Sequence, residues 1–461
     1  MKAGSHSMPE ARPEASATLQ LVQIEVSSTH PLLLLKRALP WEALTEVMTQ
    51  HWRQHGKNVD GGRGLPWDGS LYVPLVVLML IKGFDSRQME AYLAENVVAR
   101  VFIGRQRAAK AQLRDHSNIA RAYAALGKEG IDAVNRWVVK EAHRFGFVDE
   151  GSLSADTPAQ ELPIGYSNEA GILRGLAQRC GRALTQLRKR GVQGREGALN
   201  QVQTILRSVK EHHHFTSGKA AKQQVLTRIL REVGKLMVQT RPLVERLATR
   251  SERVIQSARS QLVAMHEVIK PLMAQIVYWL TTGKVAAHKI IHVGICQARA
   301  IVRNKAGKKT EFGLAYLISR LDGGYLFGER IVANADEKQM PLKALAGYRV
   351  IFGPRATPEL MVYDRGGDST PTRQRLASEG VKDVGIQPKG NRPWSVAEAV
   401  RDHIRSERGR TEGCMGTLQS NRYRFNKPKE RLWHTLEMAG PRSILSFNLN
   451  KLMRDVVALT R

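Results

Sequence analysis

Three acidic residues have the types and spacing needed for phosphoryl-transfer chemistry. Asp156 ends the short apolar run LSAD, and Asp364 ends a second run in ELMVYD. Each run is typical of a buried strand that delivers an aspartate at its carboxyl end. Glu412 is a single carboxylate in the basic stretch RGRTEGCMGTLQSNRYR, where Met415 and Leu418 recur at helical spacing. Two strand-end aspartates and one helix-borne glutamate are what a magnesium-dependent site needs.

The reason for three carboxylates is the charge that develops during the reaction. In-line attack on a phosphodiester places negative charge on the entering and the departing oxygen, and two divalent ions about 3.5–4 Å apart stabilise both. Mg²⁺ prefers hard oxygen ligands and keeps several waters, so a few carboxylates suffice to hold it. Without metal, three packed acids repel one another and one of them takes up a proton. Arg408 and Arg410, beside Glu412, offset part of that repulsion and would also receive DNA.

Other acids compete for these roles. The competitors are Asp149, Glu161, Asp368, Asp383 and Glu407. Asp149 and Asp368 are rejected because neither terminates an apolar run in the way the two chosen aspartates do. Spacing alone does not exclude Glu407. For Glu412, the alternative role is a surface ion pair with a neighbouring arginine, which contributes little to stability.

The charge balance indicates a polyanionic partner. The 461 residues include 71 Lys and Arg against 42 Asp and Glu, which gives a formal net charge of +29. Such a field drives salt-dependent attachment to DNA or RNA. An anionic membrane surface is the rival partner. However, the apolar run LYVPLVVLMLI (71–81) is too short to cross a bilayer and contains a proline, so we expect no membrane.

The amino-terminal segment and the cysteines favour a reducing cytoplasm. MKAGSHSMPEARPEASA has no apolar core like that of a signal peptide. Cys180, Cys296 and Cys414 are far apart and odd in number, so neither a disulfide framework nor a zinc knuckle is expected. The segment EHHHF (211–215) is interpreted as a solvated loop, because adjacent histidines cannot all face one metal ion.

The first third of the chain is predicted to be helical. Residues 1–20 are rich in Pro, Ser, Ala and Glu and are expected to be a disordered leader. Residues 21–145 are expected to form an N-terminal all-α domain. Its helices are predicted over 32–38, 41–52 and 71–81, then from caps at 85–86 and 115–117, and around VNRWVVKEAHRFG. Short helices joined by Gly and N-cap turns, with arginines between them, permit a DNA-binding helix-turn-helix.

The remaining residues are predicted to form an α/β fold, a mixed sheet with flanking helices. Its first part covers residues 146–166, and its remainder covers residues 291–461. Between them, residues 167–290 are predicted to be a large helical insertion after the first core strand, with an apolar stripe that steps by three or four. The second part is read as antiparallel strands, a helix, the strand ending at Asp364, a helix, a strand, and helical segments over 394–404 and from 410 onward.

Three segments carry a resemblance to a known family: DTPAQELPIGYSNEAGIL, YDRGGDSTPTRQRLASEGVKDVGIQPKG and RTEGCMGTLQSNRYRFNKPKERLWHTLEMAGPRSILSFNLNKL. They resemble bacterial insertion-sequence transposases, most closely the ISNCY-like group of DDE transposases. The resemblance covers most of the chain and is strongest in the last hundred residues. It implies a ribonuclease H-like core in which Asp156, Asp364 and Glu412 are the catalytic, metal-binding acids. It also implies Mg²⁺ as cofactor, with Mn²⁺ as a substitute.

The glutamate motif of the family also includes basic residues. Arg408 matches its arginine, four residues before Glu412, whereas Arg405 stands in the place of its tyrosine and Gln419 in that of its lysine. The missing lysine weakens the case for a basic residue that binds a phosphate at this position, and Lys389, Arg422 or Lys427 could substitute for it. The candidates for DNA binding are Arg408, Arg410, Lys389, Arg422 and Lys427, together with Lys305, Lys308 and Lys309 at a predicted hairpin tip.

The resemblance therefore implies a transposase that acts on double-stranded DNA. It would cleave phosphodiester bonds at the terminal inverted repeats and transfer the exposed 3′-hydroxyl ends to target DNA. A homodimer is expected, because two ends must be joined in one event. Two alternatives stay open: a metal-dependent nuclease of the same fold without strand transfer, and a non-catalytic basic DNA-binding protein.

Overall fold

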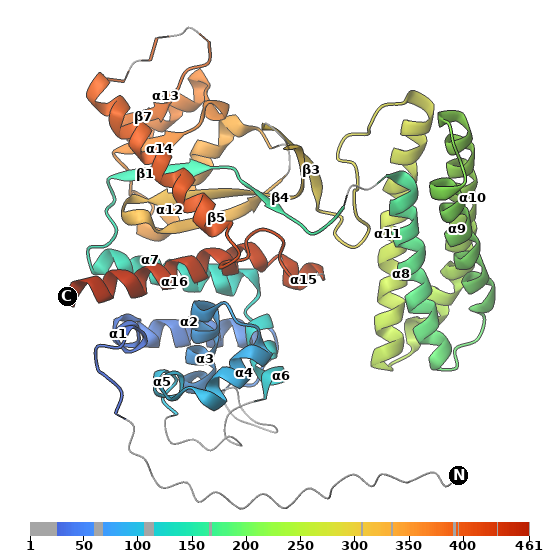
Figure 1. The fold of residues 1–461 in the computed structure, drawn as a ribbon, viewed down its shortest axis with the longest axis horizontal. Helices are drawn as coiled ribbons and strands as arrows, with labels where there is room; N and C mark the ends of the chain where they lie inside the picture. The colour runs from blue at the N-terminus through green and yellow to red at the C-terminus, as the bar shows by residue number, and fades with distance from the viewer. Residues whose placement is uncertain are drawn as a thin grey trace, which may run out of the picture.

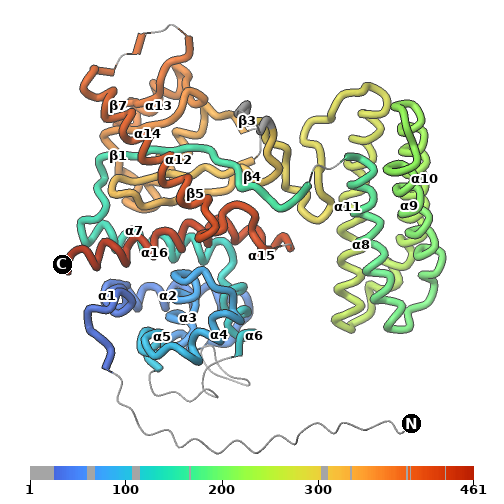
Figure 2. Tube along the Cα trace, in the orientation of Figure 1, coloured from blue at the N-terminus to red at the C-terminus, as the bar shows by residue number. Residues whose placement is uncertain are grey.

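The computed structural model describes residues 25–59, 68–105, 115–165, 168–305, 308–332, 335–390, 393–394, 396–430 and 432–460. Figures 1 and 2 show three groups of elements: amino-terminal helices, a sheet with flanking helices, and a bundle of long helices set to one side. The leader predicted over residues 1–20 lies outside the described residues.

The amino-terminal helices are α1 (Pro31–Ala38), α2 (Trp41–Gln54), α3 (Gly69–Lys82), α4 (Ser86–Glu95), α5 (Val97–Phe102), α6 (His116–Ala124) and α7 (Gly127–Arg144). Local signals set their ends. Gly83 ends α3 in the left-handed region at φ 66°, and Asp85 opens α4 with a capping box. The side chain of Asp115 accepts a hydrogen bond from the amide of Ser117 at the start of α6. These predicted starts and stops are confirmed.

Helix α3 is buried on nearly all sides, as its apolar sequence predicts. Within the described ranges, no single helix has the length and apolarity to cross a bilayer. Taken together, α3 and α4 reach that length and composition, but they are bent by 101° where they meet.

The second group of elements is built on one mixed sheet. Its strands are β1 (Ser152–Asp156), β2 (Ala159–Glu161), β3 (Arg299–Lys305), β4 (Lys308–Leu321), β5 (Leu326–Ile331), β6 (Leu360–Tyr363) and β7 (Asp383–Ile386). Its order is β2-β4-β1-β6-β7, and β3 and β5 also pair with β4. β1 is antiparallel to β4 and parallel to β6, and β6 is parallel to β7. The predicted α/β fold with a mixed sheet is therefore confirmed at this level.

The helices of this part are α12 (Met340–Phe352), α13 (Thr370–Ser378), α14 (Glu398–Leu418), α15 (Trp433–Leu436) and α16 (Ala439–Leu459). Side chains alternate along each strand, so the two faces of the sheet have separate cores. Met361 and Tyr363 belong to the core that includes α12, whereas Leu360 and Val362 pack with Ile404 of α14. Helices α12 and α14 therefore cover opposite faces of the sheet.

Helix α14 is one continuous helix, where the sequence suggested separate segments over 394–404 and from 410 onward. The side that it buries is the stripe Ile404, Glu407, Thr411, Met415 and Leu418. The helix stops at Leu418, and turns and bends follow over residues 419–430. Two members of the buried stripe are polar. The apolar periodicity of the sequence is therefore interrupted within α14, and it does not predict one continuous helix.

The predicted helical insertion is a bundle of α8 (Glu169–Lys189), α9 (Glu196–His214), α10 (Lys219–Arg246) and α11 (Arg253–Thr282). Its buried residues form a hydrophobic core of their own, separate from that of the sheet. The interpretation of 211–215 as a solvated loop is wrong for the histidines, because His212 to His214 form the last turn of α9.

The last helix, α16, closes the fold against the first helices (Figure 1). Ser446 donates a hydrogen bond of 2.7 Å to the carbonyl of Leu80, and Asn450 donates one of 3.0 Å to the carbonyl of Ile81. Both carbonyls belong to the last turn of α3, where helical carbonyls lack partners within their own helix. The amino-terminal helices, α16 and one face of the sheet thus share a single core.

Candidate active site

The pairing of β1 with β6 brings two of the predicted acids side by side. Ser152 pairs with Leu360 and Ser154 with Val362. Two residues further along each strand, the same register sets Asp156 opposite Asp364. Neighbouring strands are about 4.8 Å apart, and residues two apart share a face of the sheet. Both aspartates therefore lie at the carboxyl ends of adjacent parallel strands, on the face that α14 covers.

Two polar contacts fix α14 on this face. The Thr411 hydroxyl donates a hydrogen bond of 2.8 Å to the hydroxyl of Ser154 in β1. The carboxylate of Glu407, which is fully buried, lies 2.5 Å from the guanidinium of Arg320 in β4. Glu412 is the next residue after Thr411, and its exposed side chain leaves the buried stripe. The two contacts thus determine where α14 presents Glu412.

Asp156, Asp364 and Glu412 line one open cleft of about 610 Å³, together with Arg408, Glu311 and other residues. Arg408 lies one turn before Glu412 on the same side of α14. Three acids from remote parts of the chain therefore line the same cleft, with an arginine beside them.

Backbone amides hold both aspartates in place. Asp156 accepts a hydrogen bond of 2.7 Å from the amide of Thr157, and Asp364 accepts one of 2.7 Å from the amide of Gly366. A Cβ at Gly366 would lie 2.0 Å from a carboxylate oxygen of Glu337, so no larger residue fits there without a rearrangement. Glu337 is thus a further acid close to Asp364, and no motif in the sequence marks it.

The pKa of the Tyr363 hydroxyl is affected by the negative charge of this region. Burial raises the pKa of its hydroxyl, and a hydrogen bond with Thr157 lowers it. The charges of Asp364, Asp156 and Glu337 all raise the pKa further. Three carboxylates therefore act electrostatically on one buried phenol, which locates a negative field at the carboxyl ends of β1 and β6.

The donor chemistry of the cleft fits Mg²⁺ or Mn²⁺, because both prefer carboxylate oxygens. Among the described residues, the carboxylate oxygens of Asp156, Asp364 and Glu412 do not form a group whose members all lie within 4.8 Å of one another. In the described parts of the chain, the trio of potential ligands whose atoms all lie within 4.8 Å of one another is Glu90, Asp115 and His116. That group is an ion-pair cluster between α4 and the cap of α6, with His116 3.0 Å from Glu90.

The rival acids have structural partners. Besides Arg320, Glu407 has the guanidinium of Arg410 2.8 Å away, and it does not line the cleft. Asp368 is buried, lies 2.9 Å from the guanidinium of Arg373 and accepts a hydrogen bond from the amide of Lys389. Geometry thus separates Glu407 from Glu412 where spacing did not.

Residues 21–125 match the family model of a transposase domain (DUF772). The match supports a transposase, and so in general terms an enzyme that cleaves or transfers DNA. It covers less than a quarter of the chain and falls on the amino-terminal helices, outside the cleft. No curated protein and no solved structure matches the chain.

The basic residues predicted to bind DNA are spread more widely than the acids. Arg408 lines the cleft, and Arg410 is paired with Glu407. Lys389 is exposed, and its ammonium lies 3.5 Å from the carbonyl of Gly366, in the turn after Asp364.

The other five predicted DNA-binding residues come from other parts of the chain. Lys427 is exposed, in the segment that follows α14. Arg422 is not in the cleft. It donates a hydrogen bond of 2.8 Å to Asn450 of α16 and borders another cavity, next to the end of α3. Lys305 and Lys308 pair across the β3–β4 hairpin, as predicted for a hairpin end. The side chains of Lys305, Lys308 and Lys309 lie outside the described part of the structure.

Gln419 and Glu311 also line the cleft, and the sequence predicts this position for only one of them. Gln419 lies two helical turns after Glu412, so helical periodicity indicates its position on the cleft side of α14. Glu311 comes from β4, which reaches the cleft only through long-range strand pairing. No local signal in the sequence marks Glu311.

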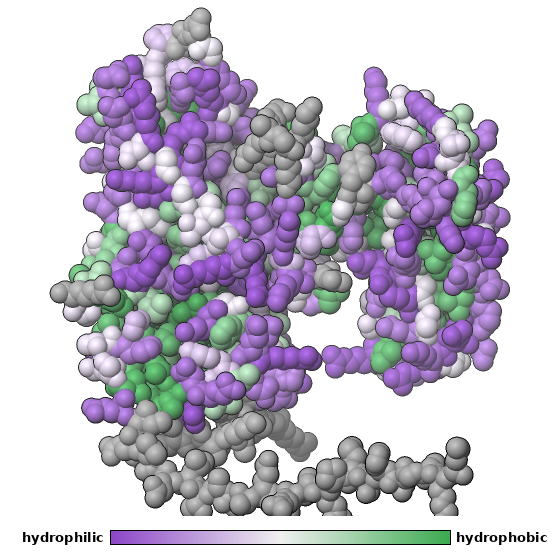
Figure 3. All heavy atoms as spheres, in the orientation of Figure 1, coloured by the Kyte–Doolittle hydropathy of each residue, from purple (hydrophilic) through white to green (hydrophobic). Residues whose placement is uncertain are grey.

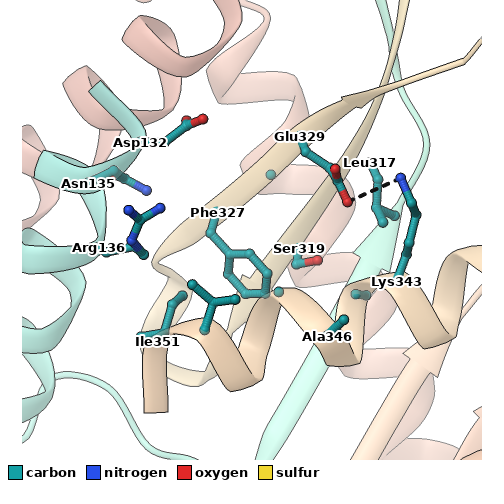
Figure 4. A pocket seen from close by; sticks show the side chains of 14 residues that line it. Asp132, Asn135, Arg136, Leu317, Ser319, Phe327, Glu329, Lys343, Ala346 and Ile351 are labelled. Atoms are coloured by element: carbon teal, nitrogen blue, oxygen red, sulfur yellow. Dashed lines mark ion pairs between the residues drawn. The ribbon is translucent and has the colours of Figure 1, made fainter. Parts of the chain in front are cut away.

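A second cavity, of about 390 Å³, lies on the opposite face of the sheet, between α7, β5 and α12 (Figure 4). Phe327 and Ile351 give it an apolar wall, and its rim carries charges of both signs. One pair on the rim is Lys343 and Glu329, 3.4 Å apart. Because no group of acids converges there, the cavity does not compete with the cleft as the candidate active site.

The Ser319→Ala variant is expected to be more stable than the wild type. Ser319 lines this second cavity and is 1% exposed, and its hydroxyl has no hydrogen-bond partner among the described residues. An unsatisfied buried polar group costs about 1–3 kcal/mol, so the free energy of unfolding should rise by about 1 kcal/mol in urea denaturation. Ser443→Ala is the control, because the buried Ser443 hydroxyl donates to the carbonyl of Tyr423. That variant should lose stability, and equal effects of the two changes would contradict the prediction.

Proposed function

We propose that the chain is a DDE transposase of the ISNCY-like type. It cleaves phosphodiester bonds at transposon ends and transfers the 3′-hydroxyl ends to target DNA. The observation that carries the proposal is the convergence of Asp156, Asp364 and Glu412 on one cleft, in a chain whose amino-terminal helices match a transposase domain. The formal net charge of +29 supports DNA as the substrate.

The three acids are the residues that would hold Mg²⁺, with Mn²⁺ as a substitute. When bound, such ions stabilise the charge that develops on the attacking and departing oxygens of the phosphodiester. The chain itself orients the ligands through the amides of Thr157 and Gly366 and through the anchored helix α14. Arg408 binds a phosphate oxygen of the DNA in the same cleft.

The other parts of the fold have supporting roles in this proposal. A central β1 between antiparallel β4 and parallel β6, with α12 and α14 on opposite faces, supports a ribonuclease H-like core. The short capped helices α4 to α6 are the candidates for a helix-turn-helix that recognises the terminal inverted repeats. Lys389, Arg410, Arg422 and the β3–β4 hairpin lysines are further candidates for DNA contacts. The protein works as a homodimer in the cytoplasm.

A joining assay tests the proposal. Duplexes that end in the terminal repeat, already cut to expose the 3′-hydroxyl, are incubated with target DNA, the full chain and Mg²⁺. A transposase joins them to the target, because the hydroxyl is the nucleophile of the second step. A nuclease hydrolyses DNA without joining, and a binding protein does neither. Ends that carry a 3′-deoxy nucleotide are the control and must stay unjoined.

A further inference from the structure

The helical bundle of α8 to α11 is strongly basic. Residues 169–282 contain 20 Lys and Arg against seven Glu and no Asp. Because the bundle buries its apolar residues in a core of its own, most of these cations lie on its surface. Figure 3 shows mainly hydrophilic residues on the face of the bundle that it displays. With so few acids available, most of the cations cannot be paired within the bundle.

Some cations of the bundle are paired with acids and others are not. On α10, Lys235 lies 2.8 Å from Glu232, Arg241 lies 3.2 Å from Glu245, and Arg228 pairs with Glu211 of α9. On α8, by contrast, Arg174, Arg182 and Lys189 are exposed. In the part of the chain that the structure describes, none of these three has an ion-pair or hydrogen-bond partner.

Arg174, Arg182 and Lys189 form one stripe along α8. At 3.6 residues per turn they fall within a sector of about 80°, and at 1.5 Å per residue they span about 22 Å. The side of α8 that is buried in the bundle includes Leu173 and Leu184, on the other side of the helix axis. Consecutive phosphates of one DNA strand rise by about 3.4 Å, so the stripe matches the length of about six to seven phosphates.

The residues between these cations favour DNA over a membrane. Gln178 and Gln186 are exposed on the same side of α8, and glutamine is one of the side chains that contact phosphate and sugar. A helix that lies on a lipid surface needs large apolar residues next to its basic face. The exposed side of α8 carries Arg, Lys and Gln in that place.

We propose that Arg174, Arg182 and Lys189, the α8 stripe, bind the phosphate backbone of a DNA duplex at a site separate from the cleft. This inference rests on the proposed function, because it takes DNA as the substrate. The contact is sequence-independent, since phosphates carry no base identity. It adds binding energy outside the cleft and leaves the recognition of transposon ends to other residues.

A charge-matched pair of triple variants tests the α8 stripe. One full-length variant carries Arg174→Gln, Arg182→Gln and Lys189→Gln. The control carries Arg228→Gln, Lys235→Gln and Arg241→Gln, so both lose three positive charges. Binding of a random-sequence duplex is measured against salt concentration without divalent ions. Each lost phosphate contact lowers the slope of log K against log salt by about 0.9. The stripe variant should therefore lose about 2.7, and the control much less.

The outcome separates this inference from the proposed function. Equal slopes in the two triple variants would overturn the α8 stripe, because bulk charge would then explain the binding. The joining assay, run with the wild-type chain, reports on the chemistry alone and does not depend on the two triple variants. A stripe effect without joining activity rejects the transposase, and joining without a stripe effect rejects this surface.

Discussion

Asp364→Asn is expected to lower the rate of end cleavage by at least about 10³-fold. A metal ion supplies several kcal/mol of charge stabilisation in such reactions, and each 1.36 kcal/mol is a factor of ten in rate. Asparagine has nearly the same shape, and its carbonyl oxygen can keep the hydrogen bond from the amide of Gly366. The substitution therefore removes a charge and leaves the fold intact. Single-turnover cleavage of an end duplex in Mg²⁺ measures the effect.

The matched control is Asp383→Asn. Asp383 is one of the rival acids, but it opens β7 and pairs with Leu360 at the start of the parallel strand β6. It therefore lies at the end of the sheet opposite to Asp364. This variant should cleave within about twofold of the wild-type rate, since it lies outside the cleft. Wild-type cleavage by the Asp364→Asn protein would reject the assignment of the site, and both variants should bind DNA as the wild type does.

Glu407→Ala is expected to lower the free energy of unfolding by about 3–5 kcal/mol. Arg320, only 5% exposed, would lose the carboxylate that lies 2.5 Å from its guanidinium. A buried charge without its partner is among the most destabilising changes in a protein. Urea denaturation measures the loss, and a change below about 1 kcal/mol would contradict the role given to this pair.

The double variant Arg320→Met with Glu407→Leu is the control. Replacing a whole buried ion pair by apolar residues is often neutral or stabilising, so this protein should be close to wild type in stability. It also tests Glu407 as the rival of Glu412. If Glu407 held the catalytic metal, the double variant would be folded and inactive. We expect it to be folded and to cleave, because Glu412 is untouched.

Much of the fold follows from local signals in the sequence. The glycine that ends α3, the capping aspartates at residues 85 and 115, and the apolar runs of β1 and β6 are each decided by a few neighbouring residues. For the same reason, the sequence alone indicates that Asp156 and Asp364 stand at the carboxyl ends of these two strands. The two aspartates lie next to each other because β1 and β6 pair in parallel.

The course of α14 could not be predicted in the same way. Two residues of its buried side are Glu407 and Thr411, and both are buried because their partners come from remote strands. Because Arg320 and Ser154 are remote from Glu407 and Thr411 in the sequence, the two polar residues break the apolar pattern of α14 without any local explanation. Contacts between remote parts of the chain also explain why Glu311 and Glu337 were missed, and why spacing alone did not separate Glu407 from Glu412.

The hydrogen bonds from α16 to the end of α3 have a consequence for biosynthesis. Ser446 and its acceptor Leu80 are 366 residues apart in the chain. At about 5–20 residues per second, the ribosome needs on the order of 20–70 s to make the intervening polypeptide. During that time the nascent amino-terminal helices lack the helix that completes their core. Chaperones would have to shield this exposed apolar surface during translation, and a fragment that ends before α16 would be prone to aggregation.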